Sequence, residues 1–266
     1  MTNNPLGSLV ELLRKANASL IGGMVIPEVD KQHIVQQLLS SVSSRSEVER
    51  FHKSVNPSGN ARVLYPWFFI PPYNGGKKLR LITGELPKTH ILSANHYELE
   101  ILRILALWDG DNPEVRHMLD ETLKRLDTAC FTCGCPKGEC VGTGVAALRF
   151  LSALRLRDDA WVAALLTHLS AHYNRLPVFY LYAAMPDIGD EACRKLVEEH
   201  KDTILPVLNR GNLTGPAEQD TYNITRLYVL RNALAMLPEY DYMRGREVIV
   251  SENDGRCRCE TGRLLA

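Results

Sequence analysis

Apolar residues recur every three or four positions from residue 95 onward, a spacing that predicts a succession of amphipathic helices. The first helix is expected to begin at Asn95, where Asn95 and Glu98 resemble a capping pair. A break at 109–112 is followed by Pro113, which fits the first position of a second helix. The two segments together predict an antiparallel helical hairpin.

This hairpin pattern returns further along the chain. The sequence Leu-Arg-Ile-Leu at 102–105 recurs as Leu-Arg-Phe-Leu at 148–151, and apolar positions of the second helix recur at the same offset. Weaker copies follow at 177–205 and from residue 216 to 237. Repetition of one hairpin unit predicts an all-α fold of tandem antiparallel hairpins.

The segments on either side of the hairpins have a different pattern. Residues 1–94 are expected to form a small helical and extended cap, with a β-hairpin or extended segment over 61–84. Residues 245–266 are expected to be an extended tail, because a turn signal at 253–255 separates two short extended runs. The predicted organisation is therefore a cap at 1–94, a repeat domain at 95–244 and a tail at 245–266.

The hairpins over about residues 95–240 resemble the α/α-toroid superfamily of protein prenyltransferases and terpenoid cyclases. The resemblance implies inner helices around a cavity, often apolar, that holds an isoprenoid or a similar hydrophobic molecule. The acidic motif of the cyclases is incomplete here, since Asp109-Gly-Asp111-Asn112 lacks the last carboxylate. The likeness is one of fold, carries no catalytic residue, and leaves a closed toroid and an open arc as alternatives.

A cysteine-rich loop interrupts the helical pattern between the first two hairpins. Its spacing is C-x2-C-x-C-x4-C, and two more cysteines lie in the tail. Zinc prefers four sulfur or nitrogen ligands, so the set predicts a structural zinc site in which three loop thiols and one tail thiol bind the metal. An iron–sulfur cluster fits the spacing less well, and reduced thiols or a disulfide are the alternatives. The candidate ligands are Cys130, Cys133, Cys135, Cys140, Cys257 and Cys259.

His168 and His172 are four residues apart on one face of a predicted helix. If that helix lines a cavity, they are the candidate catalytic or metal-binding residues. The alternative, which the pattern favours, is a hydrogen-bonded pair in the core, because the apolar face of the helix gives packing a sufficient reason.

Trp67, Phe69 and Tyr73 belong to an aromatic stretch before the first hairpin. Such a cluster can cover a ligand cavity as a lid, or it can simply belong to the core. We keep the three residues as candidates for binding a ligand.

Composition narrows the classes of function. The 31 basic and 31 acidic residues balance, and no basic stretch offers a surface for nucleic acid. No apolar run is long enough for a membrane span, and the absence of a signal-peptide pattern leads us to expect a cytoplasmic protein. Two hypotheses follow: a scaffold that binds a protein or peptide, or an enzyme that acts on a hydrophobic small molecule in a central cavity.

Overall fold

The computed structural model describes residues 5–55, 66–71, 78–129, 139–189, 191–210, 212–213, 217–251 and 256–259. Helices make up most of these residues, which confirms the predicted all-α class. The α-helices are α1 (Pro5–Gly22), α2 (Glu28–Leu39), α3 (Arg45–Val55), α4 (His90–Asp109), α5 (Pro113–Thr128), α6 (Glu139–Ala153), α7 (Asp159–Ser170), α8 (Val178–Ile188), α9 (Glu191–Arg210) and α10 (Ala217–Leu234). Two 3-10 helices, η1 (Tyr173–Arg175) and η2 (Pro238–Met243), and three short strands, β1 (Asn212–Leu213), β2 (Val248–Ser251) and β3 (Arg256–Cys259), complete the described elements.

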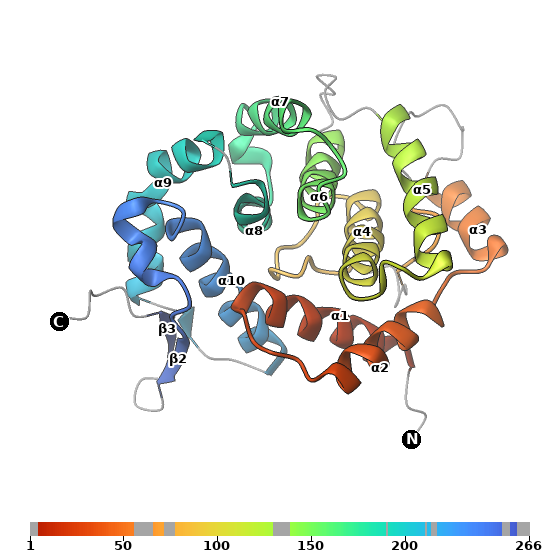
Figure 1. Cartoon of the computed structure of the whole chain (residues 1–266), viewed down its shortest axis with the longest axis horizontal. Coiled ribbons are helices and arrows are strands. Elements are labelled where there is room, and N and C mark those ends of the chain that lie inside the picture. The colour runs from red at the N-terminus through yellow and green to blue at the C-terminus, as the bar shows by residue number, and fades with distance from the viewer. Residues whose placement is uncertain are drawn as a thin grey trace.

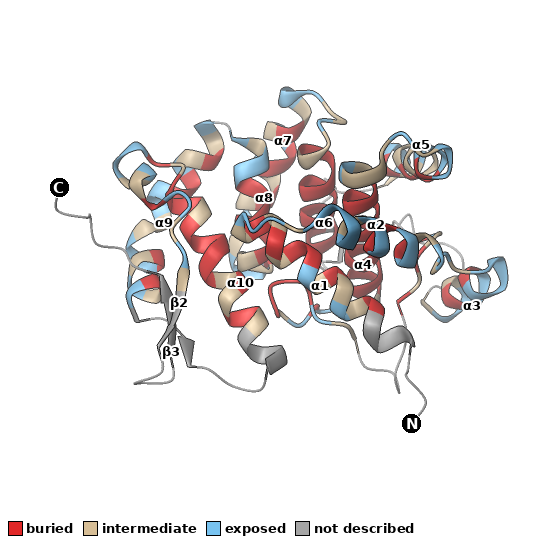
Figure 2. Cartoon of the chain, turned by 60° about the horizontal axis from the view of Figure 1, so that its bottom comes forward, coloured by how far each residue is buried: buried red, intermediate tan, exposed pale blue. Residues whose placement is uncertain are grey.

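The helices after residue 89 form an inner and an outer row. Helices α4, α6, α8 and α10 pack side by side in that order, while α5, α7 and α9 lie along the outside (Figure 1). Helix α1 packs against α10 and α4, and α2 also packs on α4. Buried residues are concentrated on α1 and the inner row, whereas α5 is exposed along much of its surface (Figure 2).

The two rows differ in how their apolar residues are distributed. Every residue of α4 from Ile91 to Leu105 is buried, as expected for a helix that is covered on all sides. Helix α5 buries a single stripe, which is the pattern of a helix with one face in solvent. Its buried residues are Val115, Met118, Thr122 and Leu126.

Helix α4 begins earlier than the sequence pattern predicts. The N-cap is Thr89, whose side chain accepts a hydrogen bond from the Leu92 backbone N–H. Asn95 is buried inside the helix, and its Nδ2 donates to the Ile91 carbonyl, so it does not cap. The expected boundary between residues 94 and 95 therefore falls within α4.

Helix α6 includes Gly142 and Gly144 near its N-terminal end. A Cβ at Gly142 would lie 2.8 Å from Cδ2 of Leu92 on α4. The glycine thus permits close packing between α4 and α6.

The predicted extended segments have different outcomes. Residues 66–71 and 78–84 contain no strand, so the described part of 61–84 forms no strand of the expected β-hairpin, and residues 82–83 form a turn. In the tail, the two extended runs pair with each other: β2 is antiparallel to β3 and places Val250 opposite Cys257. Strand β1 pairs with the other edge of β3. Across the described residues, no helix combines the length and hydropathy that a membrane crossing requires.

Candidate functional site

His168 lies in the last turn of α7, in the outer row, whereas His172 follows the end of that helix and directly precedes η1, so the expected single helix does not carry both. Their ring centroids are 5.2 Å apart in an edge-to-face arrangement, which confirms that they are neighbours. Nε2 of His168 is buried and has no hydrogen-bond partner among the described residues. Neither histidine is among the described residues that line the cavities near the end of α8, one of which is described below. The pair is therefore not placed at a described cavity, and its catalytic role stays a prediction.

The aromatic stretch is held against the body by its backbone. Oε2 of Glu98 accepts hydrogen bonds from the backbone N–H groups of Trp67 (2.6 Å), Phe68 (2.6 Å) and Phe69 (3.0 Å). Phe69 is buried in the core. Trp67 is 44% exposed, with its ring under the Arg125 guanidinium at 4.5 Å.

Neither Trp67 nor Phe69 lines the described cavities, and Tyr73 lies outside the described residues. Phe69 belongs to the core, as one of the two interpretations predicts.

The cysteine loop falls mostly outside the described ranges. Cys130, Cys133 and Cys135 are not described, while Cys140 lies in the first turn of α6, and Cys257 and Cys259 belong to β3. Strand β3 packs on α9 and α10. Within the described residues, no group of three or more His, Cys, Asp or Glu side chains could hold a metal ion. The zinc site stays a prediction.

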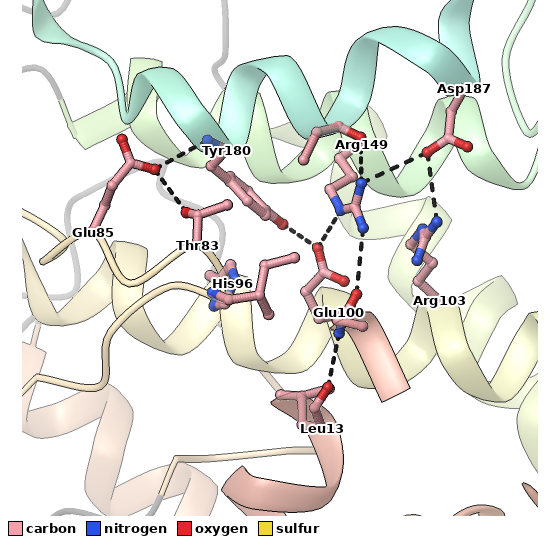
Figure 3. A network of polar contacts seen from close by, with 12 residues as sticks. Leu13, Thr83, Glu85, His96, Glu100, Arg103, Arg149, Tyr180 and Asp187 are labelled. Atoms are coloured by element: carbon pink, nitrogen blue, oxygen red, sulfur yellow. Dashed lines mark hydrogen bonds and ion pairs between the residues drawn. The ribbon is translucent and has the colours of Figure 1, made fainter. Parts of the chain in front are cut away.

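The most concentrated polar chemistry lies between the inner helices (Figure 3). Oε1 of Glu100 on α4 accepts hydrogen bonds from Nε of Arg149 on α6 (2.6 Å) and from the hydroxyl of Tyr180 on α8 (2.5 Å). Arg149 also donates through Nη1 to the Ala183 carbonyl (2.5 Å) and through Nη2 to Oδ1 of Asn17 on α1 (3.3 Å). We call Asn17, Glu100, Arg149 and Tyr180 the buried network. It joins four helices.

The buried network extends toward the surface through Asp187, near the end of α8 (Figure 3). Oδ2 of Asp187 lies 3.7 Å from Nη1 of Arg149 and 3.5 Å from Nη2 of Arg103. The Asp187 side chain is 30% exposed, whereas those of Arg149 and Glu100 are each 1% exposed. Asp187 is thus the part of this charge cluster that solvent can reach.

The electrostatics of the buried network favour a permanent ion pair. Burial alone would raise the pKa of Glu100, but the positive charges of Arg149 and Arg103 lower it to about 2. Burial and the Glu100 charge raise the pKa of Tyr180 well above its ordinary value. Since both ion-pair partners are closed to solvent, the arrangement fixes helices rather than exchanging protons with a substrate.

His96 lies beside this network, with its ring 4.8 Å from that of Tyr180. Its Nε2 accepts a hydrogen bond from the Ile82 backbone N–H (3.2 Å), so the neutral ring carries its proton on Nδ1. Burial lowers the pKa of His96 to about 4. The imidazole is therefore a neutral acceptor that holds the segment before α4.

The repeat places the Leu-Arg pairs at 102–103 and 148–149 at equivalent positions, but it does not predict that their arginines are buried charges. Both arginines are buried on the inner helices, and a third Leu-Arg pair at 230–231 places buried Arg231 on α10. An arginine within the apolar stripe of a predicted helix is the feature of the sequence that indicates a buried charge.

Arg231 contributes to a cavity of 540 Å³ where α1, α8 and α10 end. Arg194 on α9 and Arg244 after η2 also line this cavity. Because three arginines line it, we call it the arginine cavity. Arg231 donates through Nε (3.0 Å) and Nη2 (2.6 Å) to Oδ1 of Asn232. It is 3% exposed and forms the most buried part of the set.

The other two arginines are accessible. The side chains of Arg194 and Arg244 are 41% and 70% exposed and pair with Glu191 and Asp241, each three residues earlier in the chain. Each also donates to a backbone carbonyl near a helix end, Gly189 (3.4 Å) and Ala235 (3.1 Å) respectively. Among the described residues that line the arginine cavity, none is Asp or Glu.

Comparison with known proteins gives no family, because no family model, curated protein or solved structure matches this chain.

Proposed function

We propose that this protein is a helical-repeat scaffold that binds an acidic peptide segment of a partner protein in the arginine cavity. The observation that carries the proposal is the set of three arginines around 540 Å³, without a carboxylate among the described lining residues. Guanidinium groups bind carboxylates through paired, charge-assisted hydrogen bonds. The volume lies within the range of ordinary ligand sites.

The existing partners of these arginines do not prevent binding. Glu191 and Asp241 are 84% and 64% exposed, and exposed ion pairs at this spacing contribute less than about 1 kcal/mol. A carboxylate from a peptide can therefore take their place or share the same guanidinium groups. Arg231 supplies a charge at the buried side of the cavity.

The packing between the inner helices favours a scaffold over the alternative function, an enzyme with a central cavity. In the alternative, tandem hairpins of the α/α-toroid type enclose an apolar chamber for a hydrophobic small molecule. Here α1 packs against α4 and α10, and the buried network lies between the inner helices. We therefore propose an open arc of hairpins filled by its own N-terminal helix.

The proposal also includes a structural zinc ion and a cytoplasmic location. A zinc ion bound by cysteines of the 130–140 loop would stabilise the junction between α5 and α6 without taking part in peptide binding. The proposed scaffold acts in the cytoplasm, where the thiols stay reduced.

Fluorescence anisotropy with labelled peptides tests the binding function. We expect a glutamate-rich peptide to bind at low ionic strength, and glutamine-rich and lysine-rich peptides of the same length to bind at least about tenfold more weakly. The R194Q/R244Q variant should weaken binding of the glutamate-rich peptide by about tenfold or more.

R116Q is the matched control, because Arg116 is 62% exposed on α5 and its ion pair is with the nearby, exposed Asp111. Equal loss of binding in R116Q and R194Q/R244Q would show general attraction to positive charge and reject the arginine cavity. Equal binding of all three peptides would reject the proposed function.

A further inference from the structure

The arginine cavity has an apolar wall as well as its charges. Leu20 at the end of α1, Pro186 in α8 and Met236 after α10 line it together with the arginines. Leu20 and Met236 are partly buried, and Pro186 is exposed. Ligand sites ordinarily combine an apolar lining with a few polar groups that fix the orientation of the ligand. The acidic residues of a peptide alone would leave this wall without a contact.

An exposed apolar segment begins at the edge of the same cavity. Gly23 lines the cavity, and the chain continues from there through the connection between α1 and α2 (Figure 1). The Met24, Val25 and Val29 side chains are 53%, 93% and 72% exposed. We call these three residues the apolar loop. Single exposed apolar side chains are common on protein surfaces, but three so close together indicate a contact surface for a partner.

Hydrogen bonds hold the start of the apolar loop in one backbone conformation. The Ser19 carbonyl accepts from the backbone N–H groups of Gly23 (2.8 Å) and Met24 (3.1 Å), and Oγ of Ser19 donates to the Met24 carbonyl (2.5 Å). Gly23 has φ +79°, the left-handed conformation that ends many helices. A hydrophobic residue after such a glycine frequently packs back on its helix, whereas Met24 is more than half exposed. The fold therefore presents this side chain to solvent on a fixed backbone.

The charges within the apolar loop favour a peptide over a lipid surface. Glu28 and Asp30 stand on either side of Val29, and both are exposed. Anionic lipids attract arginine and lysine but repel such carboxylates. A peptide can instead place its own carboxylates on the exposed guanidinium groups of Arg194 and Arg244 and its apolar side chains beside the loop.

We propose that the partner peptide combines acidic residues with hydrophobic ones, and that its hydrophobic residues contact the apolar loop and the apolar wall of the arginine cavity. This inference rests on the proposed binding of an acidic peptide, whose carboxylates are held by Arg194 and Arg244. Burial of the peptide's apolar side chains adds a favourable contribution that salt does not screen. Carboxylates and apolar side chains of the peptide therefore contribute separately to its affinity.

Fluorescence anisotropy with three labelled peptides of equal length tests the inference. One peptide alternates glutamate with leucine, the second glutamate with serine, and the third glutamine with leucine. We expect the glutamate–leucine peptide to bind about tenfold or more tightly than either of the others. The M24S/V25S variant should bind the glutamate–leucine peptide about tenfold more weakly than the wild type does, and the glutamate–serine peptide with unchanged affinity.

L86S is the matched control. Leu86 is 58% exposed and lines a different cavity, so its replacement should leave binding of all three peptides unchanged. The melting temperature of M24S/V25S should equal that of the wild type, because both replaced side chains are exposed.

The outcomes separate this inference from the proposed function. If both glutamate peptides bind equally tightly, or if M24S/V25S binds the glutamate–leucine peptide as the wild type does, the inference is overturned and the proposed function is retained. If neither glutamate peptide binds, or if the glutamine–leucine peptide binds as tightly as they do, the proposed function itself fails. Binding of the wild type, but not of M24S/V25S, to vesicles of phosphatidylserine and phosphatidylcholine would overturn the inference by assigning the apolar loop to a membrane.

Discussion

Single oxygen atoms in this protein hold whole segments in place. Oε2 of Glu98 receives three backbone N–H groups, so one side chain on α4 orders residues 67–69. Burial raises the pKa of Glu98 to about 7, although the three N–H donors favour the ionised form. The carboxyl group therefore changes protonation near neutral pH.

Replacement of Glu98 should separate its hydrogen bonds from its charge. We expect E98A to lower the free energy of unfolding by about 2–4 kcal/mol, because three backbone N–H groups lose their acceptor. E98Q retains an acceptor oxygen and should cost about 1 kcal/mol. Because the folded pKa lies above the unfolded value of 4.5, the Glu98 contribution is present below that value and lost as pH rises toward 7.

Urea unfolding from about pH 4.5 to 7.5 measures both effects. The wild type should lose stability relative to E98Q as pH rises. E49A, which replaces an exposed glutamate, is the control, and its stability should change with pH as that of the wild type does. A constant difference between wild type and E98Q would contradict the raised pKa.

His96 should respond in the opposite direction. Its folded pKa of about 4 lies below the ordinary value of 6.5, so the folded state loses stability as pH falls between these values. We expect H96Q, which cannot be protonated, to lose less stability than the wild type over this range. Urea unfolding of the wild type and H96Q over the same pH series measures this difference. If the free energies of unfolding of the two proteins change with pH in the same way, the buried neutral imidazole is refuted.

The predicted zinc site is tested by metal content. Protein purified without added metal should contain about one equivalent of zinc, and C133S/C135S should lose it. C193S is the control, since Cys193 is buried in α9, far along the chain from the loop. Less than about a tenth of an equivalent of zinc and iron together in the wild type would reject the site.

At the scale of elements, the close contacts between segments depend on glycines. Gly84 has φ +77°, and a Cβ there would lie 2.7 Å from the ring of Tyr222 on α10. The neighbouring Thr83 carbonyl accepts a hydrogen bond from Nε of Arg226 (2.5 Å). The segment before α4 is thereby attached to α10.

Alanine substitution distinguishes the backbone conformation of Gly84 from its close packing. G84A should lower the free energy of unfolding by about 2–4 kcal/mol, through backbone strain together with overpacking against Tyr222. Gly23 has φ +79°, but a Cβ at this position would have no neighbouring atom within 4 Å, so G23A should cost only about 1 kcal/mol. Equal effects in thermal unfolding would show that contact with Tyr222 is unimportant.

Helical periodicity predicted the elements better than their ends. The apolar stripes of α5 and α7 were visible in the sequence because one face of each helix is exposed. The start of α4 was placed wrongly, since Asn95 has the chemistry of a cap but donates inside the helix. Thr89 is recognised as the N-cap of α4 only in the structure, where the path of the segment before the helix is known.

At the scale of the whole molecule, a buried ion pair connects helices that are distant in the sequence. Arg149 and Glu100 are 49 residues apart, and Arg149 and Asn17 are 132 apart. No local pattern reveals such pairing. The sequence showed that Arg103 and Arg149 occupy equivalent positions of a repeat, but their burial follows from packing between the inner helices.

Removing one partner of the ion pair should be costly. R149M should lower the free energy of unfolding by about 3–5 kcal/mol, because it leaves the buried Glu100 carboxylate without its hydrogen-bonded guanidinium partner. The double variant E100Q/R149M should recover part of this loss, and R116M on the surface should change stability by less than about 0.5 kcal/mol. Chemical denaturation measures the free energy of unfolding of each variant. A double variant no more stable than R149M would show that the unpaired Glu100 charge does not cause the loss of stability.

The contact between α1 and α10 forms late when the chain is made on the ribosome. Nδ2 of Asn232 donates to the Ile21 carbonyl (2.7 Å) across 211 residues, and the two helices pack together. During synthesis α1 leaves the ribosome long before α10 exists, so its apolar face waits without this partner while α4 to α9 are being translated. Chaperones that recognise exposed apolar helices would therefore have access to this face of α1 until α10 is made and covers it.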